Sequence, residues 1–430
     1  MRVAKPCFDC LDEAIAVDRS HLRATNEAAF WLIAYVFAAI MLGTTLPTPL
    51  YVIYQSQWHF SSEVITFIYA VYAAGVLTAL VFAGRASDQV GRRPVLAVVL
   101  ALSALSTVVF ITASSVGWLF VGRVLSGFSA GLMTGTGTAA LTEMLGPAKP
   151  RRASLVATIV NIGGLGLGPL VAGLFAQFAP NPTVLVFEVY LVLLAVGAVA
   201  VASVPETVSP RRPLSLRFAG FGFPAAGRRE FLAAGIAGFT AFGLLGIFSA
   251  LAPTFLRVVL HQDNYAIAGV VVFMLFGIAA ITEVGAGRLK DRKVISFGLA
   301  LFLLVLALIV AGLSQASMGL FLAGTAAGGI AVGCVFMGSL STANRLAPAE
   351  RRGQVISSYF VLCYLGLTIP VIGVGISSQY FGIFRSVLVC SIGLAVLSVL
   401  SFAVLRMDEV ATSGGKGVDL GRHREGHAPA

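Results

Sequence analysis

Charged side chains are scarce in this sequence. Of its 430 residues, 11% are Asp, Glu, Lys or Arg, whereas a soluble globular chain has roughly 25%. A soluble fold of this size needs polar residues over its outside, so the deficit excludes an ordinary water-soluble protein. The hydrophobic residues, 58% of the chain, gather in apolar runs of about 20 residues. Lipid is therefore the expected solvent for most of the surface.

Cysteine, histidine and acidic residues are also few. Cys7 and Cys10 form a lone CxxC, and the other three cysteines lie within apolar runs, so no disulfide framework is expected. Without a second ligand pair the CxxC predicts no metal site, and its role stays open. No nucleotide-binding loop or catalytic triad is visible, and the runs lack the clustered His, Asp or Glu that intramembrane catalysis needs. We expect neither an enzyme nor a cofactor.

The apolar runs predict twelve transmembrane helices and hence an all-α membrane protein. Each run is long enough to cross a hydrocarbon core of roughly 30 Å as a helix. The expected spans are 30–54, 62–84, 94–114, 117–142, 153–178, 183–204, 231–256, 265–287, 294–313, 317–344, 354–379 and 382–405.

The basic excess indicates topology. A net charge of +10 could suggest a nucleic-acid partner, but all except three of the 29 Lys and Arg fall in the two tails or in alternate loops. The exceptions are Arg257 and Arg385 on the opposite side and Arg123 inside a span. This asymmetry is the positive-inside bias, which predicts cytoplasmic termini and an even number of crossings. The lipid bilayer of a bacterial inner membrane, and not nucleic acid, is the expected partner.

The sequence repeats itself once. Three blocks recur with offsets between 201 and 203 residues, which predicts a duplication of six spans in parallel orientation. The matched blocks are Gly84-Arg-Ala-Ser-Asp88 with Gly287-Arg-Leu-Lys-Asp291, Pro169 with Pro370, and Gly127 and Gly131 with Gly329 and Gly333.

The duplication predicts the domain organisation. We expect two six-helix bundles at 30–204 and 231–406, joined by a cytoplasmic linker at 205–230 that is rich in Pro, Gly and Arg. Cytoplasmic tails at 1–29 and 407–430 complete the chain. In parallel-repeat transporters the solute site lies near the bilayer midplane between the bundles.

The loop after the second span carries the most specific motif, Gly84-Arg-Ala-Ser-Asp88-Gln-Val-Gly91-Arg92-Arg93-Pro94. It resembles the signature loop of the major facilitator superfamily, and Glu143 resembles the carboxylate that pairs with the arginines of this loop. The resemblance implies that Gly84, Asp88, Gly91, Arg92, Arg93 and Glu143 form a conformational latch that holds the outward-facing state. A static salt-bridge cluster at the cytoplasmic surface is the alternative.

The fifth span contains Gly163-Gly-Leu-Gly-Leu-Gly168-Pro169-Leu-Val-Ala-Gly173. This stretch resembles a motif of exporters that exchange substrate for protons, although Ala172 stands where a second Gly is common. Gly163, Gly168, Pro169 and Gly173 are the residues that carry the likeness. Close helix packing alone explains the small residues and is the favoured interpretation, with a gating hinge at Gly168-Pro169 as the alternative.

Two ionisable residues within spans are candidates for proton coupling. Arg123 belongs to Gly122-Arg123-Val-Leu-Ser-Gly127, which resembles the fourth-helix motif of the same superfamily, and an ionised group there costs about 2.5–3.5 kcal/mol on insertion scales. It could relay protons, pair with a substrate anion or hydrogen-bond helix carbonyls. Glu188 is the preferred carboxylate; Glu63 and Glu283 lie near the ends of their spans. The first span has no acidic residue, unlike many drug exporters.

Aromatic residues such as Tyr35 and Phe242 are candidates for the wall of a substrate cavity, although interfacial belts use the same residues. The resemblance to twelve-span drug:proton antiporters implies a monomeric secondary transporter that exports a small amphipathic compound in exchange for protons. A proton-coupled importer of a sugar, organic acid or nucleoside is the first alternative, because a fold does not fix direction or substrate. A membrane sensor or scaffold that moves nothing is the second.

Overall fold

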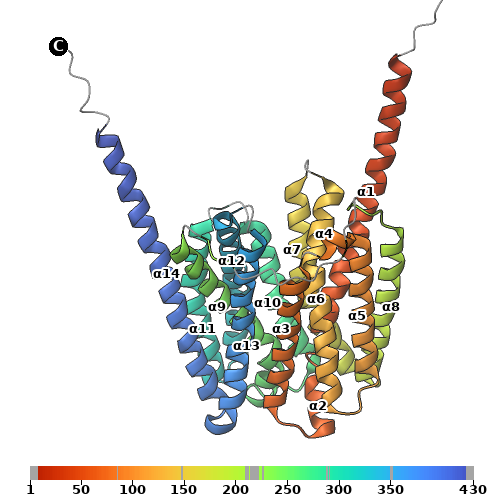
Figure 1. The fold of residues 1–430 in the computed structure, drawn as a ribbon. Helices are drawn as coiled ribbons and strands as arrows, with labels where there is room; N and C mark the ends of the chain where they lie inside the picture. The colour runs from red at the N-terminus through yellow and green to blue at the C-terminus, as the bar shows by residue number, and fades with distance from the viewer. Residues whose placement is uncertain are drawn as a thin grey trace, which may run out of the picture.

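Helices are the regular secondary structure of the described part of the chain (Figure 1). The computed structural model describes residues 8–84, 86–146, 149–208, 213, 222–224, 227–286, 289, 291–348 and 352–422. Its helices are α1 (Phe8–Thr45), α2 (Tyr51–Trp58), α3 (Ser62–Ala83), α4 (Ala86–Val90), α5 (Arg92–Ile111), α6 (Val116–Leu145), α7 (Pro150–Phe178), α8 (Pro182–Ser203), α9 (Arg228–Val258), α10 (Tyr265–Ala286), α11 (Asp291–Ser314), α12 (Met318–Leu346), α13 (Arg352–Phe381) and α14 (Ile383–Arg422).

Twelve of these helices, all except α2 and α4, are long and apolar enough to cross a membrane. Each matches one predicted span, so the prediction of twelve spans is confirmed. The first span differs in its end, because α1 stops at Thr45 and the chain turns before α2 begins at Tyr51. Pro47 and Pro49 lie in this turn, where their missing N–H groups cannot continue the helical ladder.

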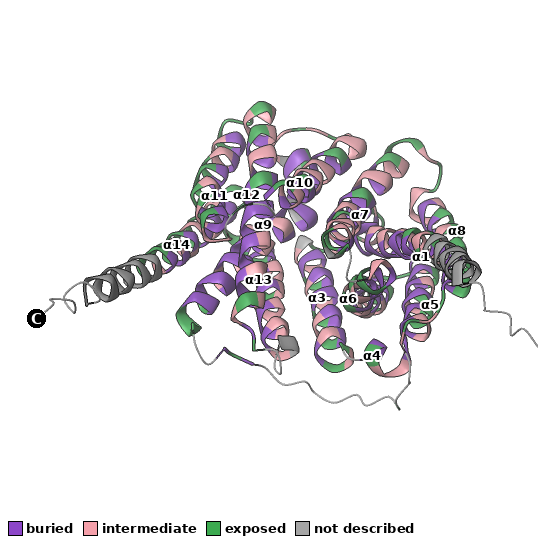
Figure 2. Ribbon diagram, turned by 90° about the horizontal axis from the view of Figure 1, so that it is seen from above, coloured by how far each residue is buried: buried purple, intermediate pink, exposed green. Residues whose placement is uncertain are grey.

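The helices form two halves with the same internal arrangement, which confirms the predicted parallel repeat. The first half contains α1 to α8 and the second contains α9 to α14 (Figure 2). Within the first half, α3 packs on α6, α1 on α7 and α5 on α8; within the second half, the corresponding pairs are α10 with α12, α9 with α13 and α11 with α14.

Glycines allow the equivalent helix pairs of both halves to pack closely. A Cβ atom on Gly127 of α6 would meet the backbone of α3 at Tyr72 and Gly75, and one on Gly329 of α12 would meet α10 at Leu275. In a membrane the hydrophobic effect does not drive helices together, because lipid tails are as apolar as the helices. Helices associate instead by close packing, which small residues allow. The repeated glycines are therefore explained by packing in both halves.

The two halves touch through α7 with α10 and through α3 with α13, which are equivalent pairs under the repeat. Both contacts lie toward the end of the molecule opposite the start of α1 and the end of α14, and these two helix ends lie on the same side (Figure 1). At one contact, a Cβ on Gly173 of α7 would lie 3.1 Å from Cα of Gly269; at the other, a Cβ on Gly375 of α13 would lie 3.0 Å from Cβ of Thr66. The halves are thus joined at one end.

The predicted domain boundaries stay predictions, but two observations concern the linker. Helix α9 begins at Arg228, so the last residues of the expected linker are helical. The amide of Gly222 donates to Oγ of Ser358 at 3.0 Å, which ties the described part of the linker to α13. Cys7 lies outside the described residues, and Cys10 lies in the part of α1 whose side chains are not described.

Candidate functional site

A cavity lies between the two halves. It is lined by α1, α3, α6 and α7 from the first half and by α9, α10, α12 and α13 from the second. Most of the wall is apolar, as in small-molecule sites that orient a ligand with a few polar groups. The polar or ionisable side chains of the wall are Thr44, Thr45, Tyr69, Tyr72, Arg123, Thr134, Asn161, Ser249, Glu283 and Tyr364.

Arg123 lies in the wall from the first half and is almost fully buried. Its Nη1 atom donates to the carbonyl oxygen of Thr44. That carbonyl is available because the amide of Thr48, in the proline-containing turn after α1, donates instead to Thr45 at 3.0 Å. Pro47 and Pro49 interrupt the helix, and the Thr44 carbonyl is thereby left free to accept from the buried guanidinium.

Aromatic rings surround the Arg123 guanidinium. Its Cζ atom lies 4.5 Å from the ring centre of Tyr72, 5.0 Å from that of Tyr69 and 5.8 Å from that of Tyr51. Within the described part of the chain no carboxylate pairs with Arg123, and its Nε atom has no hydrogen-bond partner. The ring faces and one carbonyl therefore replace a counter-ion, as cation–π contacts allow in a desolvated site.

Glu283 provides the acidic group of the cavity. It lies in α10, is 7% exposed, and its Oε1 atom has no hydrogen-bond partner among the described residues. No described Lys, Arg or His forms an ion pair with it. From the sequence, Glu283 ranks below Glu188 because it lies near the end of its span. Each is the one carboxylate of an apolar helix, so the sequence carries no signal that separates the two.

The other predicted coupling and cavity residues are separated by the fold. Glu188 is exposed on α8 and does not line the cavity. The hydroxyl of Tyr35 donates to the carbonyl of Leu193 at 2.9 Å, which places it against α8 and outside the cavity wall. Phe242 does line the cavity, where its ring packs against that of Phe336.

The residues of the predicted latch come together at the end of the molecule where α1 begins and α14 ends. Arg92, at the start of α5, makes two hydrogen bonds to Glu143 at the end of α6, of 2.7 and 3.2 Å. It also forms an ion pair with Asp88 at 2.7 Å. Gly84 is the residue at which α3 ends, and Arg93 donates from Nη2 to the carbonyl of Ala202. The charged core of this cluster is thus Arg92, held between two carboxylates.

Glu206 is a further member of the cluster. Its carboxylate accepts hydrogen bonds from the backbone amides of Arg92 at 2.8 Å and Arg93 at 3.1 Å, so it caps the start of α5. Gly91 precedes that helix with φ of 116°, and a Cβ atom there would lie 2.5 Å from Oε2 of Glu206. Glycine is required for both reasons. Among the described residues, the ion pairs of this cluster join parts of the first half alone.

The second half has a charge cluster that the sequence did not predict. Glu230 at the start of α9 accepts from Arg292 of α11 at 2.8 Å and from Arg345 of α12 at 2.7 Å. The three helices are thereby tied together at the same end of the molecule as the Arg92 cluster. Equivalent helices of the two halves are therefore fixed by different residues.

The fifth-span motif lies where the halves touch. Gly168 faces α1, where a Cβ would meet Oγ1 of Thr45, while the carbonyl of Pro169 and the backbone at Gly173 lie against Gly269 of α10. Gly163 has open space around it. Three of the four motif residues are thus at helix contacts, and two of these are at the contact between halves.

The described residues hold no group of three or more His, Cys, Asp or Glu side chains able to bind a metal ion. The charged groups of the cavity are thus the Arg123 guanidinium, surrounded by rings, on one wall and the unpaired Glu283 carboxylate on the other.

The comparison with protein families agrees with this architecture. Residues 32–369 match the family described as the Major Facilitator Superfamily. The chain belongs to the major facilitator superfamily. It is therefore a multi-pass membrane transporter that binds a small-molecule substrate, and its family indicates a transporter in place of an enzyme. No curated protein matches the sequence significantly.

Solved structures show the same fold at low sequence identity. A bacterial homolog of the human lysosomal transporter Spinster, in an inward-facing and unoccupied conformation, is 15% identical with a TM-score of 0.68, covering 89% of this chain and 97% of the other. The inward-facing and occupied form of that homolog has 14% identity, a TM-score of 0.70 and the same coverage. The nucleoside transporter NupG is 15% identical with a TM-score of 0.66, covering 88% and 99%.

Proposed function

We propose that this transporter exports a small amphipathic compound in exchange for protons, with Glu283 as the proton-carrying residue. The observation that supports this is the burial of the Glu283 carboxylate in the cavity wall without a cation beside it. An unpaired ionised carboxylate in such surroundings costs several kcal/mol. Glu283 is therefore stable there when it holds a proton or faces a cationic group of a substrate. Alternation between these two states couples the two fluxes.

The groups around Glu283 favour this role over that of a structural ion pair. Tyr69, Tyr72 and Tyr364 face the same cavity, and Arg123 is the described cation in its wall. Arg123 is already engaged with Thr44 and the tyrosine rings. A solute with apolar body and a polar or charged end would find an acidic group on one wall and a basic group on the other.

Alternating access accounts for the arrangement of the two halves. If the termini are cytoplasmic, as the distribution of Lys and Arg predicts, the contacts of α7 with α10 and α3 with α13 close the periplasmic side. The latch residues then lie at the open cytoplasmic side, where Asp88, with 58% of its side chain exposed, is available to the second half. The cavity of about 90 Å³ is smaller than the roughly 300 Å³ of a drug-sized site, so substrate binding requires further separation of the halves.

Glu283 replaces Glu188 as our coupling candidate because Glu188 does not reach the cavity. We also propose that the protein works as a monomer in the bacterial inner membrane. Each half supplies one wall of a single site, so one chain provides a complete transport pathway.

The decisive experiment measures proton flux in everted membrane vesicles that contain the protein. Respiration acidifies the lumen, and drugs, dyes and metabolites are then added singly. Dissipation of the pH gradient by one compound identifies an exported substrate. Glu283→Gln is expected to abolish this dissipation while retaining substrate exchange in the absence of a gradient, and Glu188→Gln serves as the matched control with wild-type behaviour.

Three other outcomes would contradict the proposal. Wild-type coupling in Glu283→Gln would remove Glu283 as the proton carrier. Silence across the panel, with uptake of labelled sugars, organic acids or nucleosides by intact cells, would establish the importer. Saturable binding of a compound by the purified protein without any flux in proteoliposomes would establish a sensor or scaffold.

A further inference from the structure

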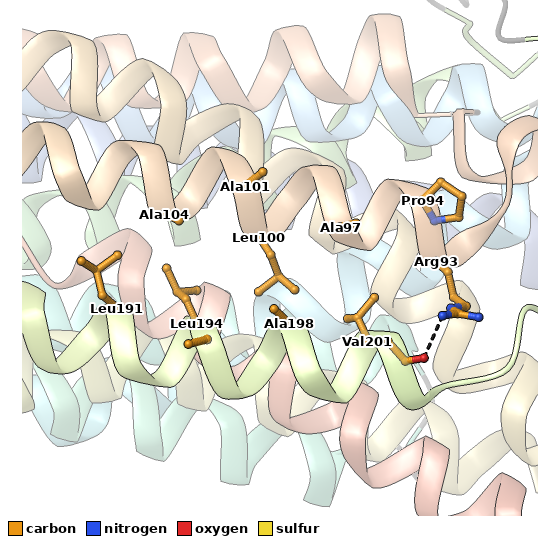
Figure 3. Close-up of a pocket in the computed structure, with 12 residues that line it drawn as sticks. Arg93, Pro94, Ala97, Leu100, Ala101, Ala104, Leu191, Leu194, Ala198 and Val201 are labelled. Atoms are coloured by element: carbon orange, nitrogen blue, oxygen red, sulfur yellow. Dashed lines mark hydrogen bonds between the residues drawn. The ribbon is translucent and has the colours of Figure 1, made fainter.

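A second hollow lies outside the transport pathway, between α5 and α8 (Figure 3). These helices are at the outer side of the first half, away from the second half (Figure 2). The groove has a volume of about 750 Å³. Its floor includes the buried side chains of Leu100, Leu194 and Val201, and its walls are largely alanines, of which Ala101 and Ala198 are exposed.

One end of this groove is basic and the rest is apolar. Arg93 lies at the end of the groove where α5 begins (Figure 3), and its Nη2 atom donates to the carbonyl of Ala202 at 2.7 Å. Its Nε and Nη1 atoms make no hydrogen bond with other described residues. Two donors of the guanidinium therefore remain for a ligand, and the planar fork suits a phosphate group.

The length of the groove corresponds to one leaflet. It extends along α5 from Arg93 to Ala104, which is about 16 Å at a rise of 1.5 Å per residue. Half of a hydrocarbon core of roughly 30 Å is about 15 Å. Arg93 belongs to the first turn of α5, at the membrane surface, so the groove runs from the headgroup region to the bilayer centre.

We propose that this groove is a binding site for an anionic phospholipid. One acyl chain lies along the alanine walls, and the headgroup phosphate binds the free donors of Arg93. Alanine faces in membranes usually mark helix contact, but Ala97, Ala101, Ala195 and Ala198 are exposed here, so no further described helix covers them. The wall offers no polar side chain besides Arg93, which favours a ligand with a single charged end and a long apolar chain.

The test is native mass spectrometry of the purified protein with equimolar phosphatidylglycerol and phosphatidylethanolamine of matched chains. The wild type is expected to retain phosphatidylglycerol preferentially. Arg93→Gln should reduce that preference about fivefold, the value of one basic residue near an anionic lipid. Arg228→Gln, which removes an exposed arginine at the start of α9, is the matched control and should bind as the wild type does.

A second variant addresses the groove itself. Ala198→Phe fills the space beside Leu194 and should reduce retention of both lipids, with unfolding temperature and monomer elution recording that the protein is folded. Equal retention of the two lipids by the wild type, or an unchanged preference in Arg93→Gln, would overturn the proposal. So would a disulfide-linked homodimer of Ala198→Cys in membranes, since a second copy would then occupy the groove.

Discussion

The hydroxyl of Tyr69 donates to the carbonyl oxygen of Ser249 at 2.8 Å, and this hydrogen bond joins the two halves at the cavity. The same hydroxyl lies 2.6 Å from Oγ1 of Thr48, and the Tyr69 ring is one of those that surround Arg123. One side chain therefore connects the buried guanidinium of the first half with α9 of the second. A rocking motion of the halves must break this bond.

Replacing Tyr69 by Phe should favour the state in which the halves separate at the proposed periplasmic side, where α7 meets α10 and α3 meets α13. A neutral hydrogen bond contributes about 1 kcal/mol, so the population of that state should rise about fivefold. The measurement is the labelling rate of a cysteine placed at Thr66 by a membrane-impermeant thiol reagent. Tyr35→Phe removes a hydrogen bond of similar length within one half and is the matched control; equal labelling in the two variants would contradict the prediction.

A disulfide between α3 and α13 should stop transport reversibly. A Cβ on Gly375 would lie 3.0 Å from Cβ of Thr66, close to the roughly 3.5–4.5 Å that a disulfide needs. The double variant Thr66→Cys with Gly375→Cys should therefore cross-link on oxidation, lose transport and regain it on reduction. The single variants control for oxidation of native cysteines. Full transport by the cross-linked protein would show that the two helices need not part.

Arg123→Lys should abolish transport while the protein still accumulates in the membrane. Lysine carries the charge, but it lacks the planar group that lies over the tyrosine rings while it donates to Thr44. Arg152 is a matched control because its guanidinium also lies near aromatic rings, those of Phe30 and Trp31, outside the cavity. Arg152→Lys should transport normally, and retained activity in Arg123→Lys would reduce Arg123 to a structural charge.

Gly91→Ala should destabilise the start of α5. A side chain at φ of 116° is strained by about 1–3 kcal/mol, and the new Cβ would also meet the Glu206 carboxylate. Gly163→Ala is the control, because that glycine is within α7 with nothing inside 4 Å of the added Cβ; it should be neutral or slightly stabilising. The unfolding temperatures of the purified variants measure both effects. Equal shifts would contradict the conclusion that the start of α5 requires glycine at position 91.

The spans and the repeat could be predicted from the pattern of the sequence, and the pairing of Arg92 with Glu143 from the resemblance of their motifs to those of the superfamily. Apolar length determines a span whatever its neighbours are, and the motif around Arg92 places Asp88 and Arg92 within one short segment, whereas Glu206 reaches Arg92 only in the folded protein. The break after Thr45 could be predicted only in part: Pro47 and Pro49 indicate a distorted helix, but the acceptor that they free for Arg123 belongs to the tertiary structure.

The orientation of side chains in apolar helices could not be predicted. Helix α8 is apolar on all sides apart from Glu188, so its sequence does not say which face meets the protein. Glu188 lies on the exposed face of α8, whereas Glu283 lies on the buried face of α10. Tyr35 was likewise expected at the cavity, and the hydrogen bond to Leu193 turns it toward α8. To say which side chains face the cavity, one must know how each helix is rotated about its axis relative to its neighbours, and the sequence of a single helix does not specify that rotation.

Glycines lie at both contacts between the halves. Gly173 and Gly269 bring the backbones of α7 and α10 together, and Gly375 of α13 packs against the side chain of Thr66 on α3. A glycine has no side-chain torsion angle of its own, so a small rotation of one half changes few torsion angles at these positions. The activation barrier for reorientation should then depend on the few polar links, such as that of Tyr69, and a single substitution there can set the turnover rate.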